Sequence, residues 1–285
     1  MWYEDLDFDF NPFEDNPEIR MIGYDEVIDE AIYGVHAGNI IFIEGKEGSG
    51  KTAILRRVID RFKGKGKVVY IKCSEIKDLN VEEVLTHKYG FIKRLFSKTP
   101  KDMILLFDDI EELSRKNTER IKYFYDQNYI RSIIFTGVNY KRLNFSDSLK
   151  DRISKILTVP ELDEDDAVEI VEERLNGKDL ISEAIIKNAF KKSDKNVKNF
   201  LKTCEDLVKF SLEQKSEKVS KEEAKVIFDG EKAVKEEVKE TKPVKKAEKK
   251  EEVKKKKEEP KKQAPKKGND DDLKIMYEDV AERYY

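Results

Sequence analysis

The residues with the clearest chemistry form a glycine-rich loop that ends in a lysine and a threonine. They fit the pattern G-x-x-x-x-G-K-[ST] and comprise Gly45, Lys46, Glu47, Gly48, Ser49, Gly50, Lys51 and Thr52. Glycines let backbone amides turn inward around a phosphate, and the start of a following helix adds partial positive charge. We expect Lys51 to reach the β- and γ-phosphates of a nucleotide and the Thr52 hydroxyl to ligate Mg²⁺. We call residues 45–52 the P-loop; the competing interpretation is a flexible loop without a ligand.

A second signal is a carboxylate at the end of an apolar run. Asp108 and Asp109 directly follow the run 103–107. A buried strand that delivers an acidic side chain at its carboxyl end can hold Mg²⁺ in a P-loop protein, through water or through the P-loop threonine. Many buried strands end in aspartate for structural reasons alone. Its combination with the P-loop is what predicts that Asp108 contributes to a magnesium site.

Five short apolar runs indicate the sheet that would position these residues. They are 40–43, 68–71, 103–107, 133–135 and 156–159. Helical spacing lies before and between them, at 27–35, 51–62, 81–94 and 115–125. Continuous apolar runs separated by helical patterns predict an α/β fold with a parallel sheet buried on both faces. The P-loop follows the first run and opens the helix at 51–62, which is the context that the phosphate pattern requires.

Beyond Pro160 the strand-like runs stop and helical spacing continues. Helices are expected to start near Asp163, Ser182, Asn196 and Ser220, and Gly230 is expected to end the last one. The predicted division is a short acidic and aromatic segment at 1–18, a nucleotide domain at 19–159, a helical lid at 160–229, a Lys/Glu-rich linker at 230–269 and an amphipathic helix at 270–285.

Charge and composition narrow the functional classes. The chain carries 57 Lys and Arg against 60 Asp and Glu, a net charge of −3. Residues 231–267 hold 16 Lys and 9 Glu, so the rest of the chain is acidic and is a poor candidate for a nucleic-acid surface. This stretch has almost no large apolar side chains to bury, which predicts a disordered linker. Its affinity for phosphates would be weak and non-specific at most. The absence of a span-length apolar run argues against a membrane protein, and two distant cysteines favour a cytoplasmic location.

The last residues have a different pattern. Three consecutive aspartates, 270–272, suit the N-terminus of a helix. Five apolar side chains then fall on one helical face: Leu273, Met276, Tyr277, Val280 and Tyr284. This pattern predicts a short helix that docks on a protein partner, and the alternative is the end of a disordered tail.

Together these segments resemble the AAA+ ATPases, and within them the clade of archaeal origin-recognition initiators and ExeA/TniB-like ATPases. The resemblance covers about residues 13–228. It rests on Asn11-Pro12-Phe13, Met21-Ile22-Gly23-Tyr24, the P-loop, Asp108-Asp109, Thr136-Gly137-Val138-Asn139, Ser148-Leu149-Lys150-Asp151-Arg152-Ile153 and the helical lid. It implies ATP and Mg²⁺ as ligands and the sheet order 5-1-4-3-2.

The resemblance also implies roles for single residues. Ile22, Gly23 and Tyr24 would pack the adenine. Asp109 stands where the family usually has the glutamate that orients the attacking water, and Thr136 or Asn139 would be the polar sensor on the fourth strand; either could instead cap that strand. Arg152 would face a neighbour's γ-phosphate or else form a surface ion pair with Asp151 or Glu161. Lys198 takes the place of the arginine usual for the second sensor in the lid.

Three functions are compatible with this pattern. The first is an Mg-ATP-dependent switch or assembly factor, which could form homo-oligomers. The second is a replication initiator or loader that contacts DNA, although the chain runs into the Lys/Glu linker where initiators usually have a DNA-binding domain. The third is a slowly hydrolysing, STAND-like adaptor that tethers partners through 1–18 and 273–285. Residues 1–18 could alternatively pack on the ATPase body.

Overall fold

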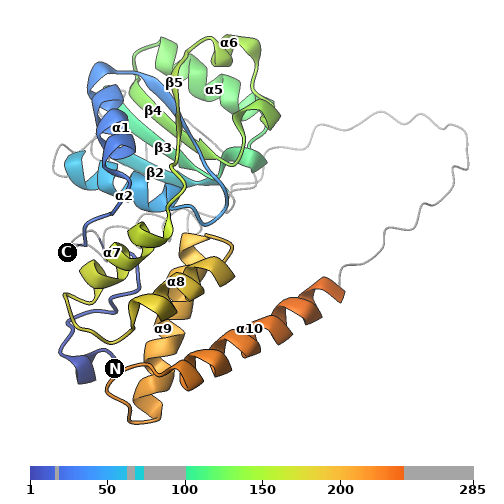
Figure 1. Ribbon diagram of the computed structural model, residues 1–285. Coiled ribbons are helices and arrows are strands. Elements are labelled where there is room, and N and C mark those ends of the chain that lie inside the picture. The colour runs from blue at the N-terminus through green and yellow to red at the C-terminus, as the bar shows by residue number, and fades with distance from the viewer. Residues whose placement is uncertain (17–18, 63–67, 74–100, 241–285) are drawn as a thin grey trace, which may run out of the picture. The chain divides into compact units, whose positions relative to one another are not determined.

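The computed structural model describes residues 1–16, 19–62, 68–73 and 101–240 (Figure 1). The helix expected at 81–94, most of the Lys/Glu linker and the helix expected at 270–285 lie outside the described residues. Residues Met1–Ala233 form one compact unit. No helix among the described residues is long and apolar enough to span a bilayer.

The core is a five-stranded parallel sheet. Its strands are β1 Ile40–Glu44, β2 Val68–Lys72, β3 Met103–Asp108, β4 Ile130–Gly137 and β5 Ile153–Thr158. The order is β2-β3-β4-β1-β5, and every neighbouring pair is parallel. The predicted α/β class and the predicted order 5-1-4-3-2 are therefore confirmed. Because all strands run the same way, their carboxyl ends meet at one edge, where β1 leads into the P-loop and β3 ends at Asp108.

The expectation of a sheet buried on both faces holds for the central strands and fails at β5. Every residue of β3 is buried, whereas most of β5 is exposed, including Ile156 at 44%. The physical reason is position in the sheet. An edge strand pairs on one side only, and helices cover it less completely.

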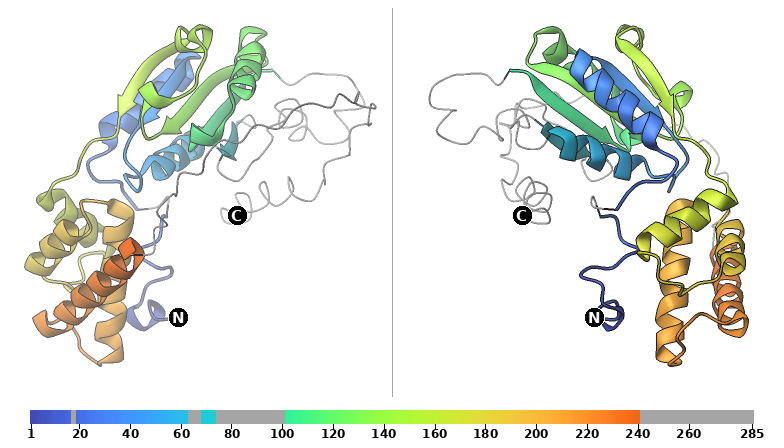
Figure 2. Two further views of the ribbon diagram at one scale, coloured as in Figure 1. Left: turned by 90° about the vertical axis from the view of Figure 1, so that its right-hand side faces the viewer. Right: turned by 60° about the vertical axis from the view of Figure 1, so that its left-hand side comes forward.

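Helices cover both faces of the sheet. Helices α1 Asp25–Ala37 and α2 Lys51–Phe62 lie on one face, and α5 Arg115–Asp126 lies on the other, next to the short α6 Asp147–Lys150 (Figures 1 and 2). On the first face, Ile41 and Ile43 pack in the same buried cluster as Leu55 of α2. On the second face, Phe107 and Phe135 stack with ring centroids 5.4 Å apart. The two apolar layers hold the carboxyl edge of the sheet in place.

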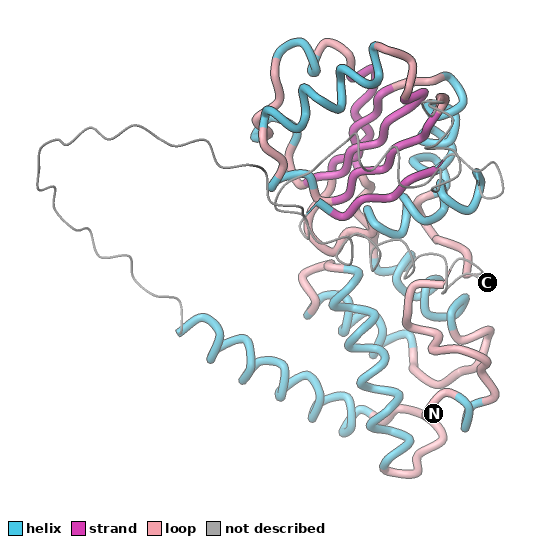
Figure 3. The backbone as a smooth tube through the Cα atoms, turned by 180° about the vertical axis from the view of Figure 1, so that it is seen from behind, coloured by secondary structure: helices cyan, strands magenta, loops and turns pink. Residues whose placement is uncertain are grey.

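The chain after β5 is helical, as the sequence predicts. The helices are α7 Glu164–Arg174, α8 Glu183–Lys192, α9 Val197–Glu213 and α10 Lys221–Glu240 (Figure 3). We call this group, α7–α10, the helical part. Asp163 caps α7 with a complete capping box, and the Asn196 side chain caps α9. Helix α10 continues ten residues beyond Gly230, where an end was expected. Its Ala, Lys and Glu residues favour helix, and the first proline comes only at Pro243.

The N-terminal segment packs on the helical part. Its Trp2 ring stacks on Phe13, with centroids 6.3 Å apart, and Lys209 of α9 lies 5.6 Å from the Trp2 ring. Asn11 donates a hydrogen bond of 2.9 Å to Glu205 of α9, and Arg174 of α7 donates to the Pro12 carbonyl at 2.8 Å. Of the two interpretations of the N-terminal segment, the structure therefore shows packing on the protein body for its described residues, 1–16.

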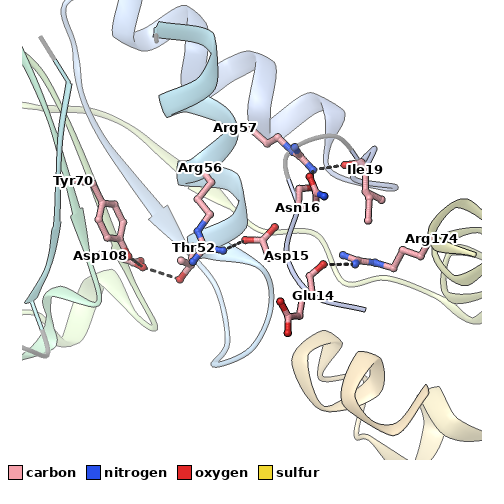
Figure 4. A network of polar contacts seen from close by, with 10 residues as sticks. All are labelled: Glu14, Asp15, Asn16, Ile19, Thr52, Arg56, Arg57, Tyr70, Asp108 and Arg174. Carbon is pink, nitrogen blue, oxygen red and sulfur yellow. Dashed lines mark hydrogen bonds and ion pairs between the residues drawn. The ribbon is translucent and has the colours of Figure 1, made fainter. Parts of the chain in front are cut away.

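The same segment then reaches helix α2 of the sheet part. Arg174 also donates to the Glu14 carbonyl at 2.8 Å, while Arg56 of α2 pairs with Asp15 (Figure 4). The next arginine of α2, Arg57, donates to the Asn16 carbonyl at 3.0 Å. Residues 11–16 thus connect the helical part to the helix that begins at the P-loop.

Candidate functional site

The P-loop joins β1 to α2 and has the backbone of an inward-turning loop. Gly48 and Gly50 have φ of +72° and +92°, a region that residues with a side chain rarely adopt. At Gly45, a Cβ would lie 2.6 Å from Ser49 Oγ and 2.9 Å from Val159. These glycines are therefore required by the fold of the loop, as the phosphate pattern predicts.

Lys51 lies inside the loop. Its side chain is buried, and its ammonium donates hydrogen bonds of 2.9 Å to the carbonyls of Gly45 and Lys46. Among the described residues, Ser49 Oγ is buried without a hydrogen-bond partner. A buried cation and an unsatisfied hydroxyl in a loop of turned amides fit an incoming phosphate, which would supply acceptor oxygens to both.

Asp108 is the centre of a buried polar cluster at the end of β3. It has no exposed surface, and three hydroxyls from three different elements donate to it. Thr52 of α2 and Tyr70 of β2 donate to Oδ2 at 2.7 and 2.9 Å, and Thr136 of β4 donates to Oδ1. Figure 4 shows the Thr52 and Tyr70 bonds. The predicted pairing of the P-loop threonine with Asp108 is thus present in the geometry, and Tyr70 joins it.

Asp109 sits at a turn beside this cluster. It adopts the left-handed conformation, with φ of 52°, at the start of a short 3-10 helix, Ile110–Glu112. Its amide donates to Thr136 Oγ1 at 3.1 Å, so Thr136 bridges both aspartates. Burial, and next the negative charge of Asp108, raise the pKa of the Asp109 carboxyl above its ordinary value. The structure therefore places a second carboxylate next to the Asp108 cluster with an environment that disfavours its charge.

The two candidates for the polar sensor lie in different surroundings. Thr136 is buried against Asp108. Asn139 instead caps the 3-10 helix Tyr140–Arg142, and its Oδ1 accepts a hydrogen bond of 3.0 Å from the Lys141 amide. The geometry joins Thr136 to the predicted magnesium residue, whereas Asn139 caps the short 3-10 helix after β4 and not the strand itself.

The segment Ile22-Gly23-Tyr24 supports the P-loop from the core. Ile22 and Tyr24 are buried, and Gly23 has φ of +79° with Leu162 only 2.6 Å from where a Cβ would lie. The Tyr24 hydroxyl donates to the Ser49 carbonyl at 3.0 Å. Burial is the main cause that raises the pKa of Tyr24 to about 12, so its hydroxyl stays a donor at physiological pH. The packing of adenine by this segment stays a prediction.

The helical part contacts the tip of the P-loop. The Asn196 side chain donates to the Glu47 carbonyl at 2.8 Å, and the Lys198 amide donates to the Gly48 carbonyl at 3.2 Å. A Cβ at Gly48 would lie 2.2 Å from Asn196 Oδ1. Lys46 pairs with Glu161, and this ion pair holds the pKa of the Glu161 carboxyl below its usual value. The first turn of α9, with the exposed side chain of Lys198, thus lies beside the predicted phosphate site.

Arg152 lies away from this site within one chain. It precedes β5, at the amino edge of the sheet, which is the edge opposite the P-loop. Its Nε is 3.3 Å from Asp126 Oδ1, and its side chain is about half exposed. The ion-pair alternative predicted Asp151 or Glu161 as the partner, and Asp126 is the residue found. A contact between Arg152 and a phosphate would need a second copy of the chain.

Oxygen ligands suited to Mg²⁺ meet at the Thr52–Asp108 contact. Mg²⁺ prefers hard oxygen ligands and usually binds through one or two protein groups, nucleotide phosphates and waters. A hydroxyl and a carboxylate 2.7 Å apart fit that requirement. Among the described residues there is no cluster of three or more His, Cys, Asp or Glu side chains that could hold a metal by protein ligands alone.

Sequence reasoning missed two residues of this region. Tyr70 lies inside an apolar run and was assigned to the buried strand, although a hydroxyl two positions before the carboxyl end of β2 falls within reach of the neighbouring β3. The contact of Asn196 joins residues 149 positions apart. Its helix-capping role is readable from the sequence, but its bond to Glu47 depends on where the helical part docks.

A parallel sheet of this order, a P-loop after its first strand and an acid at the end of the third define the P-loop nucleotide-binding fold. Residues 37–162 match the sequence family described as "AAA domain". No curated protein matches the sequence. The fold is similar to that of ORC1 from Aeropyrum pernix, solved in complex with DNA, with TM-score 0.63 and 15% identity over 81% of this chain and 70% of that one.

Two further solved structures share the fold. Cdc6p from Pyrobaculum aerophilum is 13% identical, with TM-score 0.59 over 74% of this chain and 68% of that one. The RuvB Holliday junction branch migration motor of Thermotoga maritima is 14% identical, with TM-score 0.55 over 73% of this chain and 69% of that one. The predicted resemblance is confirmed: the chain has an AAA+ P-loop fold that resembles the archaeal origin-recognition proteins.

Proposed function

We propose that this chain binds ATP with Mg²⁺ and hydrolyses it slowly, as a nucleotide-dependent switch. The observation that carries the proposal is the Thr52–Asp108 contact beneath the P-loop. This contact joins Thr52 of the P-loop to Asp108 at the end of β3, a carboxylate of the kind that binds Mg²⁺. The two residues are 56 positions apart in the sequence. When bound, Mg²⁺ would neutralise charge on the phosphates.

Each residue of the site has a part in this proposal. Lys51 and the P-loop amides bind the phosphates, and Thr52 and Asp108 hold Mg²⁺. Asp109 orients the attacking water; since aspartate is one methylene shorter than the usual glutamate, hydrolysis is slow. Thr136 fixes the Asp108 carboxylate and the Asp109 backbone amide. Asn196 and Lys198 carry the state of the P-loop to the helical part, and Arg152 acts from a neighbouring copy.

The test is ATP affinity in the Lys51→Ala variant, measured calorimetrically with Mg²⁺. We expect affinity to fall by about 100-fold, because the buried ammonium would otherwise pair with phosphate oxygens. Lys155→Ala is the matched control, since this lysine lies in β5 outside the P-loop and its half-exposed side chain pairs with Glu30. Unchanged affinity in Lys51→Ala would show that the site is misassigned. Light scattering with ATP, ADP and no nucleotide would separate an assembling ATPase from a monomeric switch.

A second candidate is a DNA-linked ATPase. What favours it is the fold shared with an origin-recognition protein solved with DNA. Against it stand the acidic body and the interspersed Glu residues of 231–267. Steep salt dependence of DNA binding, lost on deletion of 231–267, would support this candidate, and absent binding at low salt would remove it. A cytoplasmic location and a protein partner for residues 270–285 stay predictions.

A further inference from the structure

Tyr70 has a position that the proposed ATPase site does not yet explain. It lies in β2, the edge strand next to β3, and its hydroxyl donates to Asp108 Oδ2 at 2.9 Å (Figure 4). A phenylalanine of the same size would fill the same space without placing a polar group beside a carboxylate. The tyrosine hydroxyl therefore has a task at Asp108 beyond packing.

The hydroxyl groups around Asp108 divide between its two oxygens. Thr136 donates to Oδ1, and both Thr52 and Tyr70 donate to Oδ2. The Thr52 hydroxyl is also the predicted metal ligand, so its oxygen must serve Mg²⁺ as well. Tyr70 belongs to a strand that carries no other predicted site residue, and its hydroxyl bond is to Asp108. This bond fixes Oδ2 independently of whether Thr52 is engaged by the metal.

The Tyr70 hydroxyl donates to the carboxylate from a strand next to β3, at 2.9 Å from Asp108 Oδ2. A hydrogen-bond donor in this position can orient the carboxylate without being a metal ligand itself.

We propose that Tyr70 is a positioning residue for magnesium, which acts through Asp108 and contacts neither nucleotide nor metal. The proposal rests on the proposed ATP site. Hydrogen-bond partners that orient metal ligands contribute about 10- to 100-fold to metal affinity in other proteins. Tyr70 accordingly raises the affinity for Mg-ATP relative to metal-free ATP.

The test compares ATP affinity in EDTA with Mg-ATP affinity at saturating Mg²⁺, both by calorimetry. In Tyr70→Phe we expect the ratio of the two affinities to fall about tenfold, with affinity in EDTA unchanged. Tyr125→Phe is the control, since its hydroxyl donates to the Gly38 carbonyl at 2.7 Å, at the other edge of the sheet. An equal loss of both affinities, or an unchanged ratio, would overturn the proposal.

A double-mutant cycle shows whether the effect passes through Asp108. In the Asp108→Asn background, Tyr70→Phe should leave the affinity ratio unchanged, because the carboxylate it orients is gone. Additive losses would mean that Tyr70 acts elsewhere. If the wild-type protein binds ATP in a way that depends on Lys51, and Tyr70→Phe has the wild-type ratio of affinities, only this inference fails. If the wild type binds no ATP, the proposed function fails first.

Discussion

The P-loop is held from two sides that are built differently. On the sheet side, Asp108 has no exposed surface and receives hydroxyl bonds from α2, β2 and β4. On the other side, among the described residues, the start of α9 donates hydrogen bonds from Asn196 and Lys198, and Lys46 pairs with Glu161, just before α7. The side chains of that ion pair are 81% and 64% exposed.

The difference in burial implies a difference in strength. A buried hydrogen bond to a charged group contributes about 1.5–3 kcal/mol, whereas an exposed ion pair contributes about 0–1 kcal/mol. The Asp108 cluster is therefore the preorganised side of the P-loop. The contacts from Asn196, Lys198 and Glu161 are more exposed, and the proposed switch would use them as its movable side.

The largest effect is expected on the preorganised side, from Asp109→Asn. An amide cannot act as the water-orienting base, so hydrolysis should fall by about 100-fold or more while ATP affinity changes little. Phosphate release under saturating ATP measures the hydrolysis rate, and calorimetry measures the ATP affinity. Asparagine also tolerates the left-handed backbone at this position. Hydrolysis within a factor of two of the wild type would exclude Asp109 from the role.

The effect of the same variant on thermal stability should depend on pH in a definite direction. Because the pKa of Asp109 is raised in the folded protein, folding favours its protonated form. The stability from that form is present below the ordinary aspartate pKa and is lost as the pH rises through the raised value. At pH 7, Asp109→Asn should thus raise Tm slightly, by about 1–2 °C, and the gain should vanish toward low pH. A lower Tm at pH 7 would contradict this sign.

Thr136→Val tests how much the buried cluster contributes to the fold. The variant leaves a buried carboxylate with one donor fewer, and it should lose about 2 kcal/mol of stability, or roughly 4–8 °C in Tm. Ser132→Ala on the same strand is the control. Its buried hydroxyl donates to the neutral Asn39 carbonyl at 2.6 Å, so its loss should be about half as large. Equal losses in thermal unfolding would mean that the charge of Asp108 adds nothing.

The smallest effect is expected on the movable side, from Asn196→Asp. An aspartate keeps an oxygen for the Asn199 amide, which caps α9, and removes the donor to the Glu47 carbonyl. Tm should change by less than about 2 °C, but amide hydrogen exchange in the P-loop should become a few-fold faster without nucleotide. Exchange at the wild-type rate would show that this contact does not restrain the loop.

The sequence predicted the preorganised side better than the movable one. Apolar runs located the five strands and their class, and the glycine pattern located a loop whose glycines are required by its backbone. These features follow from local rules of strand burial and backbone conformation. The sequence also predicts that Asp108 and Thr52 contribute to one site, because a carboxylate that ends a buried strand can hold Mg²⁺ through water or through the P-loop threonine.

Contacts set by tertiary packing were beyond the sequence. Tyr70 could not be distinguished from a core residue, because its place in an apolar run does not indicate which group its hydroxyl contacts. The partner of Arg152 proved to be Asp126, which comes from α5 rather than from the residues beside it in sequence. Helix α10 continues beyond Gly230, where its end was expected, since one glycine costs about 1 kcal/mol and its neighbours favour helix.

The placement of the N-terminal residues has a consequence for how the protein is made. Asn11 pairs with Glu205, which is synthesised 194 residues later. At ribosomal rates of about 5–20 residues per second, the first residues wait roughly 10–40 s for the helices that cover their tryptophan and phenylalanines. During that interval an acidic, aromatic stretch is open to chaperones and proteases on the ribosome. Its seven acidic residues, with no basic one in positions 1–18, help keep that stretch dissolved until its docking surface exists.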